Sequence, residues 1–169
     1  MRKKRSFSPG AFYHVGSRTN NKTTIFSGKL GQKIMLFTMR NAKNKYKFRL
    51  FNFCIMPTHI HLLISPADNT TLSQIMQWIK TQSAKLWNEI HGSMNHVWGD
   101  RYFVRKIISI KDFYSVWRYI DENPVKSGLV TYILDWKPSG AYHISKNINE
   151  LVDYIPKEHT YYIKMLPPP

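Results

Sequence analysis

The sequence predicts an α+β fold in which a largely antiparallel sheet carries helices packed on it. Short apolar and aromatic runs have the length of strands, and two of them are separated only by Pro57-Thr58. One long segment, 72–90, instead carries apolar residues at helical spacing. The predicted order is strand, helix, strand, strand, helix, strand, helix, which is typical of this class.

The first segments of the chain predict a strand, a turn and a helix. Residues 11–18 (Ala-Phe-Tyr-His-Val-Gly-Ser-Arg) have the composition of a strand, and the polar, Asn-rich residues 19–24 are typical of a turn. From about residue 27 to residue 43, apolar residues recur at helical spacing with basic residues on the remaining faces.

The middle of the chain predicts a hairpin followed by a helix. Residues 48–55 form the second predicted strand, and after the break at Pro57 a third strand runs to Ser65. Because so short a connection favours antiparallel pairing, we expect these two strands to be neighbours. The apolar positions between residues 72 and 90 follow one helical stripe, so this is the best-defined helix of the sequence.

The last segments predict a strand and a capped helix. Residues 102–109 have strand composition, and Ser109 followed by Asp112 resembles a capping box that begins a helix. We expect this helix to end near Asn123-Pro124 and the chain to turn at Gly128.

Length and charge limit the function classes. The 169 residues suffice for one domain with its own core. We expect a core at about 8–145, a basic tail at 1–7 and an unassigned extension at 146–169. The formal net charge is +15, and no acidic residue precedes Asp68. Such an excess favours a polyanionic partner, nucleic acid or an anionic membrane surface, over a role in solubility alone.

Other features indicate a cytoplasmic protein. The basic N-terminus lacks the apolar stretch of a secretory signal, and no run is long enough to span a membrane. The single cysteine, Cys54, cannot form an internal disulfide and gives no metal-cluster signature.

The run His59-Ile60-His61 is the most informative motif of the chain. In a strand, His59 and His61 point to one face while Ile60 points to the other. Two imidazoles on a rigid strand suit a divalent metal ion, although the spacing alone is equally compatible with two structural histidines on a half-exposed sheet face.

Tyr119 and Asn123 lie one turn apart on the last predicted helix, at the border of its apolar stripe. If this helix docks on the sheet face that carries the histidines, a phenol and an amide meet the two imidazoles. Each residue also has a structural interpretation: Tyr119 is one of ten tyrosines, and Asn-Pro often ends a helix.

Together these segments resemble the HUH single-tyrosine transposases, and within them the REP-associated tyrosine transposases. The segment 53–66 (FCIMPTHIHLLISP) resembles the family's His-hydrophobic-His motif, and 118–130 (RYIDENPVKSGLV) resembles its tyrosine helix. Weaker matches are 13–20 (YHVGSRTN) and 98–103 (WGDRYF). The matches run in family order from about residue 10 to residue 140.

The resemblance implies a ferredoxin-like two-layer sandwich, the HUH nuclease fold, and a transposase that acts on single-stranded DNA beside hairpins. It implies His59 and His61 as ligands of Mg²⁺ or Mn²⁺, Tyr119 as the nucleophile and Asn123 as the third ligand, for which Glu122 or a water is the alternative. It also implies a 5′-phosphotyrosine intermediate, and either a monomer or a homodimer that exchanges tyrosine helices. An activity on DNA implies a protein of the bacterial cytoplasm that is associated with the nucleoid.

DNA contacts are expected from basic residues near the site and in the tail, although a solvated charged face is the plain alternative for each. The expected contacts are Arg2, Lys3, Lys4, Arg5, Arg18, Arg101 and Arg105. Tyr114 lies on the opposite flank of its helix from Tyr119, and His14 is left without a role, as a surface or core residue.

Two other functions remain open from the sequence. A non-catalytic protein that binds nucleic-acid hairpins would keep the basic surface but would need neither metal nor Tyr119. A metal-dependent RNA phosphoesterase would use a metal-bound water and leave no protein-linked product.

Overall fold

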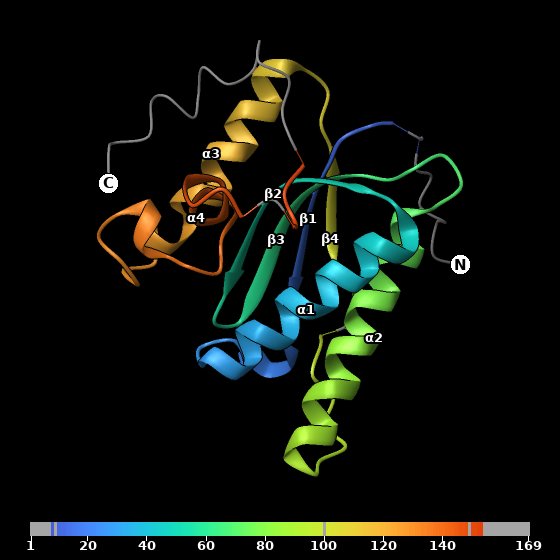
Figure 1. The fold of residues 1–169 in the computed structure, drawn as a ribbon, viewed down its shortest axis with the longest axis vertical. Coiled ribbons are helices and arrows are strands. Elements are labelled where there is room, and N and C mark those ends of the chain that lie inside the picture. The colour runs from blue at the N-terminus through green and yellow to red at the C-terminus, as the bar shows by residue number, and fades with distance from the viewer. Residues whose placement is uncertain (1–7, 9, 100, 149, 154–169) are drawn as a thin grey trace.

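The computed structural model describes residues 8, 10–99, 101–148 and 150–153. Its centre is a four-stranded antiparallel sheet in the order β2-β3-β1-β4 (Figure 1). The strands are β1 (Tyr13–Arg18), β2 (Arg49–Met56), β3 (His59–Ser65) and β4 (Phe103–Lys106). The helices are α1 (Lys29–Tyr46), α2 (Leu72–His91), α3 (Ile110–Lys126) and α4 (Gly140–Ser145), with 3-10 turns at Asn20–Lys22 and Ile133–Asp135.

The hairpin predicted around Pro57-Thr58 is confirmed. β2 and β3 pair antiparallel, with Met56 opposite His59 at the turn. The chain order β1, α1, β2, β3, α2, β4 with this strand order is the split βαβ arrangement of ferredoxin-like sandwiches. The predicted α+β class, with an antiparallel sheet and helices packed on it, is therefore confirmed.

Helices cover both faces of the sheet, as Figure 1 shows with α1 and α2 on one side and α3 and α4 on the other. On the first face, strand residues such as Ile60, Leu62 and Ile64 join the apolar stripes of α1 and α2 in one buried core. On the second face, Phe113 and Trp117 of α3 pack in a smaller core. This second core holds α3 beside the strand that carries the histidines.

Two element ends differ from the sequence-based prediction. α3 does not end at Asn123-Pro124 but continues to Lys126 with Pro124 inside it. Proline removes one backbone N–H, but the next turn still closes, because the N–H groups of Ser127 and Leu129 donate to the carbonyls of Asn123 and Pro124. β4 is shorter than the predicted strand 102–109 and pairs with β1 only over Phe103–Lys106.

The start of the C-terminal extension contacts the domain. Leu151 is buried in the first core. The N–H of Asp153 donates to the carbonyl of Leu50, and its carboxylate accepts from the N–H of Leu50 and pairs with Lys43 at 2.8 Å. Residues 154–169 lie outside the described part of the chain. Within the described part, no helix has both the length and the apolar character needed to cross a bilayer.

Candidate active site

The two histidines of the predicted motif lie on β3, on the sheet face that α3 covers. His61 pairs with Gly16 of β1, and His59 pairs with Arg18. Ile60 between them is fully buried on the opposite face. The alternation predicted for this strand is therefore confirmed, and both imidazoles share one face.

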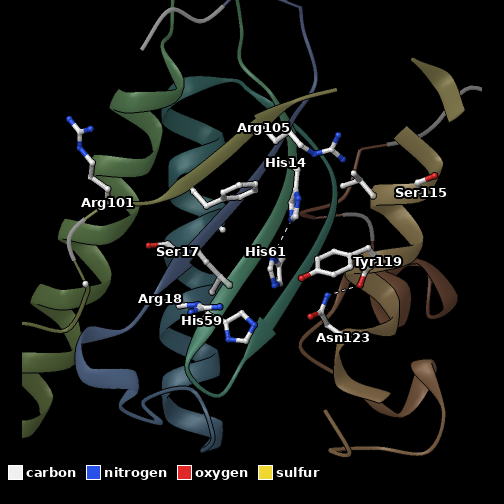
Figure 2. A pocket seen from close by; sticks show the side chains of 15 residues that line it. His14, Ser17, Arg18, His59, His61, Arg101, Arg105, Ser115, Tyr119 and Asn123 are labelled. Carbon is white, nitrogen blue, oxygen red and sulfur yellow. Dashed lines mark hydrogen bonds between the residues drawn. The ribbon is translucent and has the colours of Figure 1, made fainter. Parts of the chain in front are cut away.

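A cleft of about 1020 Å³ opens between this face and α3 (Figure 2). It brings together the predicted site residues that the structure describes, namely His59, His61, Tyr119, Asn123, Arg18, Arg101 and Arg105. The predicted tail contacts Arg2, Lys3, Lys4 and Arg5 lie outside the described residues.

The histidines are close to one another and to the tyrosine. The ring centroids of His59 and His61 are 4.9 Å apart, and those of His61 and Tyr119 are 5.4 Å apart. Burial lowers the pKa of His61 to about 3, and burial with the neighbouring Arg18 lowers the pKa of His59. Both imidazoles are consequently neutral at pH 7, the form in which a histidine can bind a metal ion.

Tyr119 and Asn123 enter the cleft from α3. The Tyr119 side chain is 44% exposed, so its phenol is open to a substrate. The amide nitrogen of Asn123 donates to the carbonyl of Tyr119 at 2.6 Å. That bond occupies the nitrogen and leaves the carboxamide oxygen, which Figure 2 shows on the cleft side, free to accept or to bind an ion.

A buried polar pair fixes α3 on the sheet. The Asn52 amide on β2 donates to the Asp121 carboxylate at 2.8 Å and to the Trp117 carbonyl at 3.3 Å. The Asn52 oxygen accepts from the N–H of Phe53 at 2.8 Å, so the amide cannot turn freely. Since Asp121 lies between Tyr119 and Asn123 in sequence, this contact sets which side of α3 faces the cleft.

The cleft has a cationic lining. Arg18, Arg101 and Arg105 contribute to it, and no Asp or Glu does so among the residues that the structure describes. Arg105 forms an ion pair with Asp112 at 2.9 Å, and this contact together with the N–H of Ile108 lowers the pKa of the Asp112 carboxyl. A cleft lined in this way favours an anionic substrate.

Two residues of the site were missed by the sequence interpretation. His14, to which no role was assigned, lies in the cleft with its Nε2 3.1 Å from Nδ1 of His61. Phe103 lines the cleft and is 54% exposed. The available signal was the alternation of His14, Gly16 and Arg18 on one face of the first strand. Tyr114, predicted on the opposite flank of the helix from Tyr119, is not among the residues that line the cleft and packs near Phe113.

Comparison with known proteins identifies the family. The family model described as "Transposase IS200 like" matches residues 8–123, which include both histidines, Tyr119 and Asn123. The chain belongs to the IS200-like transposase family. A curated relative from Haemophilus influenzae, described as a REP-associated tyrosine transposase, is 30% identical over 154 residues, which cover 83% of this chain and 84% of the relative.

Solved structures agree with the fold of this transposase. A REP-associated tyrosine transposase bound to a REP hairpin has a TM-score of 0.73 at 19% identity, with 92% of each chain covered. A transposase from Deinococcus radiodurans has a TM-score of 0.51 at 17% identity, covering 72% of this chain and 97% of that one. Family membership makes the chain a tyrosine transposase, an enzyme of the class that the sequence motifs indicated.

The donor set of this transposase fits a divalent metal ion with mixed ligands. Among the described residues, no group of three or more His, Cys, Asp or Glu side chains is arranged to hold a metal. His59, His61 and Asn123 all line the cleft and could offer an ion two nitrogens and one oxygen. Nitrogen donors suit Mn²⁺ better than Mg²⁺, which prefers oxygen ligands.

Proposed function

We propose that this transposase nicks and joins single-stranded DNA beside hairpins, with Tyr119 as the nucleophile. The observation that carries the proposal is the position of the Tyr119 phenol, which faces the two neutral imidazoles of β3 across an arginine-lined cleft. The family membership supports the reaction class, and the cationic lining supports a phosphodiester substrate.

His59, His61 and Asn123 would hold Mn²⁺ or Mg²⁺. When bound, the ion would polarise the scissile phosphate and offset the charge that develops on its oxygens. The chain's own contribution is to keep the imidazoles unprotonated by burial and to hold the amide oxygen on the cleft side. Arg18, opposite His59 on the next strand, adds positive charge for the same phosphate.

In the proposed step the phenol oxygen of Tyr119 forms a bond to phosphorus, and the bond between phosphorus and the 3′ oxygen breaks. The phenol proton is lost, and the departing oxygen gains one to become a free 3′-hydroxyl. The product is a 5′-phosphotyrosine link. Because one phosphodiester replaces another, a 3′-hydroxyl can reverse the step and join strands without ATP.

The edge strand β4 supplies a path for the unpaired strand. Arg101, Phe103 and Arg105 lie at alternate positions and line the same cleft. Phe103 and Arg105 are alternate residues of β4, about 6.6 Å apart, and Arg101 lies just before the strand. Together the three side chains can offer a cation, a ring and a cation to successive parts of one DNA strand. An exposed ring is a platform on which an unpaired base stacks.

Hairpin-flanked DNA is the substrate class that the comparisons support best. The solved REP-associated transposase with the same fold is bound to a REP hairpin. The basic residues 2–5 and the acid-free first 67 residues supply further charge for a folded DNA element. Such a substrate would be met in the cytoplasm, at the nucleoid, by a monomer or a homodimer.

A covalent adduct assay tests the proposal. The wild-type chain, a hairpin-bearing single strand and Mn²⁺ should give a protein–DNA adduct that survives denaturation, and EDTA should prevent it. Tyr119→Phe should lose the adduct and keep DNA binding, whereas the control Tyr114→Phe should keep both. An adduct formed by Tyr119→Phe would contradict the nucleophile, and binding without any adduct would favour the non-catalytic hairpin-binding function.

A further inference from the structure

A third imidazole contacts the histidine pair from the neighbouring strand. His14 of β1 is only 7% exposed, and its Nε2 lies 3.1 Å from Nδ1 of His61. Gly16, which pairs with His61, has no side chain between the two rings, and a Cβ there would lie 3.5 Å from the same Nδ1. Ring contacts with Phe103 and Tyr119, both at 5.6 Å between centroids, hold His14 in place.

The two ring nitrogens lie at hydrogen-bond distance, and a hydrogen bond between two imidazole nitrogens contains one proton. Either His61 carries its proton on Nδ1 and donates to His14, or His14 carries its proton on Nε2 and donates to His61. These two arrangements differ in function. Only the first leaves Nε2 of His61, the nitrogen on the ring edge away from His14, with a free lone pair.

We propose that His14 is a positioning residue that accepts a hydrogen bond from Nδ1–H of His61 and thereby keeps Nε2 of His61 unprotonated. His14 itself then carries its proton on Nδ1. A histidine that binds a metal commonly donates its other N–H to an acceptor that fixes its tautomer and ring orientation. Figure 2 shows His61 between His14 on one side and His59 on the other. The inference rests on the proposed function in taking His61 as a ligand.

The tautomer can be measured on the metal-free protein. ¹⁵N-labelled histidine NMR should give a protonated, pyrrole-like shift for Nδ1 of His61 and a pyridine-like shift for Nε2. His14 should show the same pattern, with its proton on Nδ1. A proton on Nε2 of His61 would overturn the inference, regardless of whether the protein binds a metal ion.

Two substitutions at residue 14 separate hydrogen bonding from packing. His14→Phe keeps a ring of similar size against Phe103 and Tyr119 but removes the acceptor. His14→Gln loses the ring but can place an amide oxygen near the position of Nε2. The control His143→Gln removes a buried imidazole that packs on Phe53 and does not line the cleft.

Mn²⁺ alone is the probe, followed by the loss of the free-ion EPR signal. His14→Phe should weaken Mn²⁺ binding about 10- to 100-fold, while His14→Gln and His143→Gln should stay close to wild type. Equal affinity of the Phe variant and wild type, or a loss in the Gln variant alone, would show a packing role and overturn the inference. Absence of Mn²⁺ binding by wild type would contradict the proposed metal site itself, and the NMR result would still decide the hydrogen bond. Thermal melting of each variant verifies that it is folded.

Discussion

The buried carboxyl of Asp121 makes the stability of this transposase depend on pH. Its side chain is 1% exposed and accepts from the Asn52 amide, while its Oδ2 has no hydrogen-bond partner in the described structure. Burial raises the pKa of this carboxyl to about 7 from its ordinary value of 3.8. We therefore expect Asp121→Asn, which keeps the shape of the side chain and removes the ionisation, to change the pH profile of unfolding.

The sign follows from the two states of the carboxyl. At low pH, Asp121 is protonated in both the folded and the unfolded chain, and its ionisation costs nothing. As the pH rises from about 4 to about 7, the unfolded chain ionises first, so the wild type loses stability. The full loss is about 4 kcal/mol, since each pH unit between the two pKa values corresponds to about 1.4 kcal/mol.

Urea unfolding followed by tryptophan fluorescence measures this effect. Between pH 4 and pH 8, the unfolding free energy of Asp121→Asn should rise by about 4 kcal/mol relative to that of the wild type. Other carboxyls cancel in this difference because both chains contain them. The exposed control Asp135→Asn should leave the profile unchanged. A constant difference between Asp121→Asn and wild type would refute the reasoning.

Three further predictions concern the DNA path and the support of α3. Phe103→Ala should lower the affinity for single-stranded DNA about 10-fold, since base stacking contributes about 1–3 kcal/mol, while Phe103→Trp should keep the wild-type affinity. Unchanged binding by the Ala variant in a filter or fluorescence assay would exclude stacking. Arg101→Ala should reduce the slope of log K against log salt by about 1, and an unaltered slope would mean that Arg101 contacts no phosphate. Gly140→Ala should destabilise the fold by about 1–3 kcal/mol, because its Cβ would clash with the side-chain oxygen of Asn52.

Local periodicity explains which parts of the site were predictable. His59 and His61 share a face because strand side chains alternate, and Tyr119 and Asn123 are neighbours because a helix turns every 3.6 residues. The turn at Pro57-Thr58 likewise fixes the hairpin locally. Each of these relations depends on residues close in sequence, so the sequence is sufficient to predict them.

The remaining features depend on contacts between distant segments. The strand order places His14 beside His61 across 47 positions. The alternation around residue 14 indicates which residues share its face, but not which strand lies next to it. The Asn52–Asp121 pair spans 69 positions. In the sequence, an aspartate beside Glu122 in a helix is typical of a solvent-exposed charge, and only the packing of the helix on the sheet buries it. The continuation of α3 past Pro124 depends on bonds made by Ser127 and Leu129, which outweigh the local preference of proline to end a helix.

Peptide mapping of the covalent adduct tests the central claim most directly. The wild-type chain would be reacted with a hairpin-flanked single strand and Mn²⁺, digested with nuclease and protease, and analysed by tandem mass spectrometry. We predict a nucleotide linked through a 5′-phosphate to Tyr119, and unmodified peptides for the other nine tyrosines. A nucleotide on Tyr114 or any other side chain, or cleaved DNA with no modified peptide, would contradict the account.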